Sequence, residues 1–238
     1  MTSGTRECPW GRLGRRRTAG TACREAYADG VRVELCDDRG AAGFTWIVDE
    51  PATRASHALA DGGRVWVVDP VRVDRALEDA QSLGQPVAVV QLLDRHNRDC
   101  AAIAAELGIS HLVVPDGVPD SPFEAIALTR KRRWHETALW WPEARTLVVA
   151  EAIGTNRFFT AGREVAGVHL LLRLAPPHDA LGRLEPEHLL VGHGRGVHGP
   201  AAAAALQGAL DGSRRGLPRL LARVPGFAAD AIRRRRSA

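Results

Sequence analysis

Residues 87–107 constrain the fold more than any other part of the chain. Valines, leucines and an alanine surround one glutamine in residues 87–93, which predicts a strand that is buried on both faces. Residues 100–107 are almost all strong helix formers, and Gly108 supplies a stop. A buried strand that passes so directly into a helix is typical of an α/β protein whose sheet is at least partly parallel.

The link between this strand and this helix gathers potential metal ligands. Two carboxylates, one imidazole and one thiol lie within seven residues, and α/β proteins usually keep their chemistry at such a strand end. The same residue types also serve as turn and helix-cap residues, so a metal site and a plain structural turn both remain open. The residues are Asp94, His96, Asp99 and Cys100.

Length and composition indicate a globular protein. The 238 residues make one large domain or two small ones, and 45% hydrophobic residues are enough to bury a core. No apolar run approaches the roughly 18 residues of a membrane helix, and no apolar stretch follows the N-terminal arginines as it would in a signal peptide. We therefore expect a cytoplasmic protein without a membrane partner. Its four cysteines lack C-x-x-C spacing and are expected to be free thiols: Cys8, Cys23, Cys36 and Cys100.

The net charge of +4 belongs to the two ends of the chain. Residues 1–25 carry six arginines and two acids (+4), residues 233–236 are four arginines (+4), and the segment between them therefore sums to −4. Because the folded body offers no basic stripe, nucleic-acid binding is disfavoured. We expect a disordered basic extension over residues 1–25, a globular domain over 26–212, and a C-terminal helix with a basic tail over 213–238.

Strand patterns flank the central α/β unit on both sides. Residues 31–35 and 43–48 alternate with period two, and residues 64–68 predict a strand that ends in Asp69-Pro70. A helix over 73–83 follows, and a strand over 111–115 completes a β-α-β-α-β unit. Further strands are expected at 125–128, 137–141, 145–150, 168–174 and 189–191, and an alanine-rich helix at 200–210.

This order of elements resembles that of the metallo-β-lactamase superfamily. The strand that ends in Asp69-Pro70 resembles the family's first signature, and residues 94–100 take the place of its ligand loop, HxHxDH. Residues 139–152 resemble the segment that leads to the family's bridging aspartate, and residues 189–194 resemble the strand and loop that present its last histidine. The resemblance covers residues 27–212 and implies a four-layer αββα sandwich.

The ligand loop departs from the family's motif. Aligned without a gap, HxHxDH keeps His96 but puts Asp94 at the first histidine, Arg98 at the aspartate and Asp99 at the last histidine. One inserted residue restores Asp99 as the aspartate and puts Cys100 at the last histidine.

The later signatures match the family's motifs at one position and depart from them at two. Lys131 stands at the third-site histidine, with His135 four residues along the chain. Glu151 replaces the bridging aspartate, whereas His193 matches its histidine outright. Whether His135, Lys131 or Cys100 takes part in a site is left open.

The resemblance implies a metal-dependent hydrolase of a small ester, thioester or lactone. In that family, zinc, or sometimes iron or manganese, lowers the pKa of a bound water to near 7 and polarises the scissile bond. A set rich in carboxylates favours iron, manganese or weakly held zinc. The implied ligands are Asp94, His96, Asp99, Glu151 and His193, with Asp99 also orienting the nucleophile.

A second hypothesis is a degenerate member of the fold that binds a small molecule or regulates, without catalysis and without a metal. Under it, Asp99 caps a helix, Asp94 pairs with a neighbouring arginine, and Cys100 packs in the core. Geometry discriminates between the two hypotheses. Ligands that converge in a metal site would support the hydrolase, whereas a cavity filled by the fixed charge of Arg98 or Lys131 would support the non-catalytic protein. The substrate and the oligomeric state are left open.

Overall fold

Residues 24–28, 31–96, 98–132, 134–162 and 164–237 are described by a computed structural model. The basic extension predicted over residues 1–25 lies outside them, apart from Arg24 and Glu25, which begin the first strand. No helix among the described residues is both long and apolar enough to cross a membrane.

The first sheet has seven strands in sequential order, β1 to β7. Its first five strands form an antiparallel meander, whereas β5, β6 and β7 run parallel and are joined by α1 and α2. The predicted β-α-β-α-β unit is therefore confirmed. The strands are β1 (Arg24–Ala28), β2 (Val31–Cys36), β3 (Gly43–Val48), β4 (Ala55–Asp61), β5 (Arg64–Val68), β6 (Gln85–Gln91) and β7 (Ser110–Val113).

The second sheet has five strands in the order β14-β13-β10-β9-β8. Strands β10 and β13 run parallel, and the other neighbours are antiparallel. The strands are β8 (Glu124–Lys131), β9 (Trp134–Trp141), β10 (Thr146–Val149), β13 (His188–Val191) and β14 (Val197–His198); β11 (Ile153–Gly154) and β12 (Gly167–Val168) form a separate pair.

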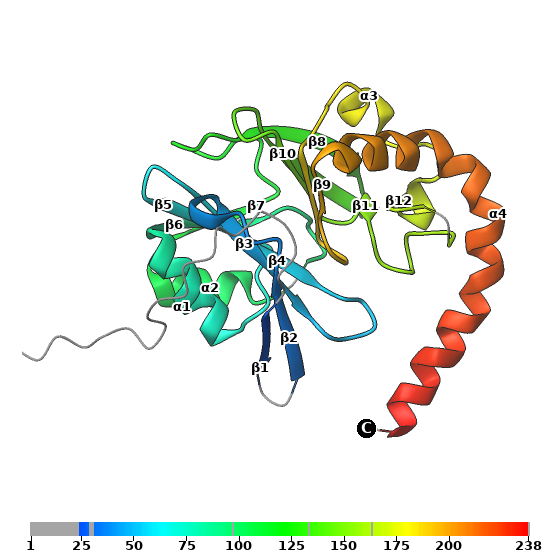
Figure 1. Cartoon of the computed structure of the whole chain (residues 1–238), viewed down its shortest axis with the longest axis horizontal. Helices are drawn as coiled ribbons and strands as arrows, with labels where there is room; N and C mark the ends of the chain where they lie inside the picture. The colour runs from blue at the N-terminus through cyan, green and yellow to red at the C-terminus, as the bar shows by residue number, and fades with distance from the viewer. Residues whose placement is uncertain (1–23, 29–30, 97, 133, 163, 238) are drawn as a thin grey trace, which may run out of the picture.

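Helices cover the outer face of each sheet, so the predicted four-layer αββα sandwich is confirmed (Figure 1). One hydrophobic core lies between the two sheets, and a second lies between the first sheet and helices α1 and α2. Helix α4 packs on β12, β13 and β14. The helices are α1 (Asp74–Leu83), α2 (Cys100–Leu107), α3 (His178–Leu181) and α4 (Pro200–Ser237), with short 3₁₀ turns η1 (Gly40–Ala42) and η2 (Leu170–Leu172).

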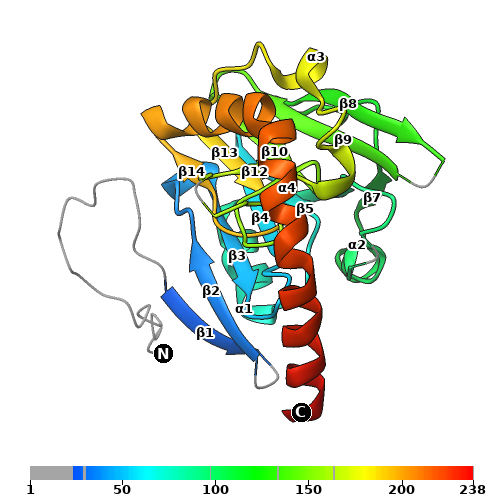
Figure 2. The ribbon, with the colours of Figure 1, turned by 90° about the vertical axis from the view of Figure 1, so that its right-hand side faces the viewer.

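Two segments differ from the sequence-based expectation. The strand predicted over residues 168–174 ends at Val168 and gives way to η2, because the His169 side chain accepts a hydrogen bond from the Leu171 amide and starts a tight turn. The helix predicted over 200–210 continues to Ser237 and changes direction part-way along (Figure 2). Pro218 lies in the helix interior, where proline removes a backbone hydrogen bond and bends the axis.

Parallel strands bring the segments of interest to one edge of the sandwich. The loop after β6 joins β9 through a bridge between Leu93 and Glu136, and the loop after β13 joins the start of β4 through a bridge between Arg54 and His193. The carboxyl ends of strands in both sheets therefore meet at this edge, which is where α/β folds place their sites.

Candidate functional site

Asp69 anchors the site at the end of β5. Its side chain is almost fully buried, with Oδ1 accepting a hydrogen bond from the Leu92 amide at 3.0 Å and Oδ2 lying 3.0 Å from Nδ1 of His96. Its φ of +45° is unusual for a residue other than glycine and is typical of functional or strained positions. Burial raises the pKa of this carboxyl, but the charge and hydrogen bond of His96, together with Arg98, hold its pKa below the ordinary value.

His96 is buried in the loop after β6, and Asp69 determines which of its nitrogens carries the proton. Because an ionised carboxylate only accepts hydrogen bonds, Nδ1 of His96 donates to Asp69. The lone pair then lies on Nε2, which is buried and has no hydrogen-bond partner among the described residues. The His96 ring lies edge-on to that of His193, with ring centroids 5.6 Å apart.

His193 is held in the same tautomer from the second sheet. Its Nδ1 donates to the Ala52 carbonyl at 2.9 Å, and its ring stacks on Phe159 with centroids 5.6 Å apart. Burial, together with the positive charge of Arg98, lowers the pKa of His193 to about 3, so the ring is neutral near pH 7. A Cβ on Gly192 would lie 2.2 Å from the Ala150 carbonyl oxygen, which confirms that the chain needs a glycine before His193.

Arg98 ties the loop to the ends of three strands. Its guanidinium donates to the carbonyls of Ala55 and Asp69 from Nη1, and to that of Gly192 at 3.0 Å from Nη2. Its Nε is buried and finds no acceptor in the part of the chain that the structure describes. The sequence offered two positions for a fixed charge, and the structure puts Arg98 beside Asp69 and His193.

Two of the predicted ligands are engaged with other partners. Glu151 forms an ion pair with Arg95 at 2.7 Å and lies 3.8 Å from Nε2 of His169. Asp99 stands at the N-cap position of α2, but its carboxylate accepts the Arg72 amide at 2.7 Å and makes no cap hydrogen bond. The structure does not bring Asp99 and Glu151 together with the two histidines.

Asp94, at the start of the loop after β6, lies near His135 of β9. Its Oδ2 lies 4.0 Å from Nδ1 of His135, and its Oδ1 is buried without a partner among the residues described. Three alternate residues of one loop thus carry an unsatisfied buried atom: Asp94, His96 and Arg98. Such groups call for a bound water, ion or ligand.

The remaining candidates lie outside this arrangement. Cys100 is buried in the core between the first sheet and its helices, and burial raises the pKa of its thiol to about 12, so it is inert. Cys100 is a free thiol and Cys36 is buried, whereas Cys8 and Cys23 fall outside the described residues. Lys131 ends β8 and is exposed.

Two important residues were given no role from sequence. Asp69 was recognised only as part of a strand-end signature. Glu136 is fully buried in β9, where Oε1 accepts the amides of Glu151 and Ala152 at 2.8 Å and Oε2 accepts Nε1 of Trp134 at 2.7 Å. Burial raises the pKa of Glu136 to about 7. An acid inside an otherwise apolar strand pattern was the available signal.

The donor set can be tested against a catalytic metal. His96 and His193 fit, since ligating histidines usually engage the other ring nitrogen with a carboxylate or carbonyl. A catalytic zinc, however, takes three protein ligands. No group of three His, Cys, Asp or Glu side chains suited to a metal comes together among the described residues, and Arg98 places a fixed cation beside both rings. The described side chains therefore do not complete a metal site.

Comparison of the sequence with protein-family models and with curated proteins finds no match. Solved structures do match. A metallo-β-lactamase from Erythrobacter litoralis, with β-mercaptoethanol in its active site, has a TM-score of 0.52 at 10% identity, over 79% of this chain and 99% of that one. DIM-1 metallo-β-lactamase has a TM-score of 0.48 at 13% identity, over 80% of this chain and 98% of that one. The apo chemotaxis sensor ODP from T. denticola has a TM-score of 0.46 at 13% identity, over 76% of this chain and 94% of that one. The first of these likenesses shows that the chain has the metallo-β-lactamase fold.

Proposed function

We propose that this chain hydrolyses a small ester, thioester or lactone, with His96 as the general base. The observation that carries the proposal is the unpartnered, buried Nε2 of His96, whose Nδ1 is held by the Asp69 carboxylate at 3.0 Å. A carboxylate that fixes the tautomer of an imidazole and stabilises its protonated form is the arrangement that general-base catalysis requires.

The reaction follows from these groups. A water that donates a hydrogen bond to Nε2 of His96 attacks the substrate's carbonyl carbon, and His96 takes its proton while Asp69 stabilises the imidazolium. The carbonyl oxygen becomes an oxyanion next to Arg98, whose Nε–H has no acceptor among the described residues and whose charge is fixed. When the intermediate collapses, the alkoxide or thiolate leaves and takes the proton from His96. Neutral His193 offers a second acceptor for orienting the water.

The position and hydrogen bonds of Arg98 support a second candidate function. Hydrogen bonds to three strand-end carbonyls give Arg98 a structural role at the position where the ungapped ligand motif has its aspartate. A scaffold that has exchanged a metal-binding acid for a fixed cation can bind a small polar molecule without turning it over. This second candidate is a binding or regulatory protein.

One turnover experiment separates the candidates. Purified protein is given a p-nitrophenyl ester, an acyl thioester and a γ-lactone, first with EDTA and then with added Zn²⁺, Mn²⁺ or Fe²⁺. We expect turnover with EDTA that falls by about 100-fold or more in His96→Gln, the loss typical of a general base. His178→Gln is the matched control, because His178 is half exposed and pairs with Asp211 on α4.

Each of the other outcomes supports a different function or mechanism for this chain. Turnover that needs added metal, and that disappears in both His96→Gln and His193→Gln, would establish a metal hydrolase and overturn the mechanism above. Absence of turnover under every condition would leave the binding protein. Equal turnover in His96→Gln and wild type would remove His96 from the mechanism.

A further inference from the structure

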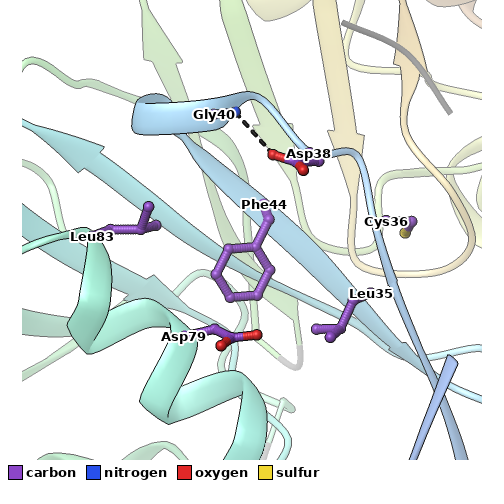
Figure 3. A pocket seen from close by; sticks show the side chains of 7 residues that line it. All are labelled: Leu35, Cys36, Asp38, Gly40, Phe44, Asp79 and Leu83. Atoms are coloured by element: carbon purple, nitrogen blue, oxygen red, sulfur yellow. Dashed lines mark hydrogen bonds between the residues drawn. The ribbon is translucent and has the colours of Figure 1, made fainter. Parts of the chain in front are cut away.

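We propose that a cavity between α1 and the outer face of the first sheet binds a small organic ammonium ion. This α1 cavity, whose lining side chains are drawn in Figure 3, has a volume of about 190 Å³. Its walls come from β2, the loop after β2, β3 and α1. The lining residues are Leu35, Cys36, Asp38, Gly40, Phe44, Asp79 and Leu83.

Asp79 supplies the reason to expect a ligand. This residue of α1 lines the cavity, and its Oδ1 pairs with Arg75 at 3.0 Å. Its Oδ2 is buried and has no hydrogen-bond partner within the described ranges. Arg75 does not remove this deficit, because it meets the other oxygen and is itself half exposed. A buried carboxylate oxygen left in this state calls for a donor from outside the chain.

The charge of the lining selects the ligand's charge. Two carboxylates, those of Asp38 and Asp79, lie on the cavity wall, and among the described residues no lysine, arginine or histidine does. Asp38 is exposed, and its Oδ1 accepts a hydrogen bond from the Gly40 amide at 2.9 Å, so the lining carries an exposed carboxylate as well as the partly buried one of Asp79. The lining therefore favours a cation that donates hydrogen bonds and excludes an anion.

The rest of the wall selects an apolar body. The Phe44 ring lies between Asp79 and the loop that carries Asp38, with Leu35 and Leu83 to either side of it (Figure 3). An aromatic face beside a carboxylate is a favourable place for an ammonium group. A cavity of about 150 Å³ accepts a ligand the size of benzene. The α1 cavity therefore suits an alkyl- or arylamine with a body of that size.

The test compares an amine with its neutral counterpart. Binding of 3-methylbutylamine and of 3-methyl-1-butanol to the full chain is measured by ¹H–¹⁵N NMR titration at pH 7, where the amine is protonated. We expect the amine to bind about tenfold more tightly or better, since it alone brings charge to Asp79, and to shift the amides of Phe44 and Leu83. Asp79→Asn should lose this preference. Glu78→Gln is the matched control, because Glu78 also approaches Arg75 but does not line the cavity.

Three results would overturn the proposal. They are equal affinity for amine and alcohol, an amine affinity that Asp79→Asn leaves unchanged, and amide shifts that lie away from the α1 cavity. Failure of the amine to saturate would have the same meaning. If Asp79→Asn does not fold, the comparison of amine with alcohol on the wild-type chain still decides the question.

Discussion

At the scale of single residues, the site depends on two imidazoles whose protons have assigned positions. Asp69 and the Ala52 carbonyl each accept a hydrogen bond from an Nδ1, so that Nε2 is the acceptor nitrogen of both His96 and His193. Arg98 supplies the positive charge next to them and helps to keep His193 neutral. The cluster therefore combines two hydrogen-bond acceptors with one cation, which is suited to a polar, uncharged substrate.

The neutral state of His193 predicts a pH dependence of stability. The pKa of His193 in the folded chain is about 3, below the roughly 6.5 of an unfolded histidine, so the unfolded chain binds more protons between these values. The stabilising contribution of neutral His193 is complete above about pH 6.5 and is lost as the pH falls toward 3. His193→Gln should therefore lose stability less steeply than wild type below pH 6.5, by about 1 kcal/mol per pH unit.

Urea unfolding at pH 7, 6 and 5 measures this difference. His57, whose pKa burial lowers to about 4, is present in both proteins, so its contribution cancels. His178→Gln, at an exposed position, should follow wild type. Parallel profiles for wild type and His193→Gln would mean that the pKa of His193 is not lowered in the folded chain.

At the scale of elements, the sequence predicted the strands and helices that carry the site better than it predicted their contacts. Period-two alternation located β2 and β3, the apolar run of residues 87–93 located β6, and the alanine-rich segment located α2, all within a few residues. Asp99 was correctly placed at the start of α2, yet its carboxylate bonds the Arg72 amide, which is brought close only by the packing of a segment 27 residues away. Local pattern encodes periodicity, whereas the partner of a side chain depends on tertiary packing.

The same limit explains the predicted ligand set. The rings of His96 and His193 lie next to each other, but Glu151 pairs with Arg95, a residue of the same loop as His96. No spacing in the sequence reveals that ion pair. The buried role of Glu136 likewise depends on the amides of Glu151 and Ala152, which the segment between β10 and β11 supplies.

The close approach of β10 and β13 gives a prediction at this scale. A Cβ at Gly192 would meet the Ala150 carbonyl oxygen at 2.2 Å, and the Gly192 carbonyl also accepts from Arg98. Gly192→Ala should therefore destabilise the chain by about 1–3 kcal/mol, the usual cost of overpacking. Gly208→Ala is the control: its Cβ would meet nothing within 4 Å in α4, so it should stabilise by about 0.5–1 kcal/mol. Thermal denaturation measures both changes, and a neutral Gly192→Ala would show that the strand ends can separate without cost.

At the scale of the whole molecule, α4 connects the sandwich to the C-terminus. Arg173 is fully buried and donates from Nη1 to the Ser213 carbonyl of α4, while Nε donates to the Val168 carbonyl. Leu220, one turn beyond Gly216, is also buried. The helix thus continues to bury side chains past residue 212, where the sequence suggested that the globular domain ends.

Two truncations test how far the folded unit extends. Removal of residues 213–238 takes away Leu220 and an acceptor of the buried Arg173 guanidinium, so the free energy of unfolding should fall by about 3 kcal/mol or more. Removal of residues 227–238 takes away the four arginines but leaves Ser213, Leu220 and the hydrogen bond from Arg223 to the Thr160 carbonyl, so stability should change by less than about 0.5 kcal/mol. Urea unfolding of the three proteins at one pH gives both values. If the chain that ends at residue 212 is as stable as wild type, the folded unit ends at residue 212. A large loss of stability in the chain that ends at residue 226 would extend the folded unit into the basic tail.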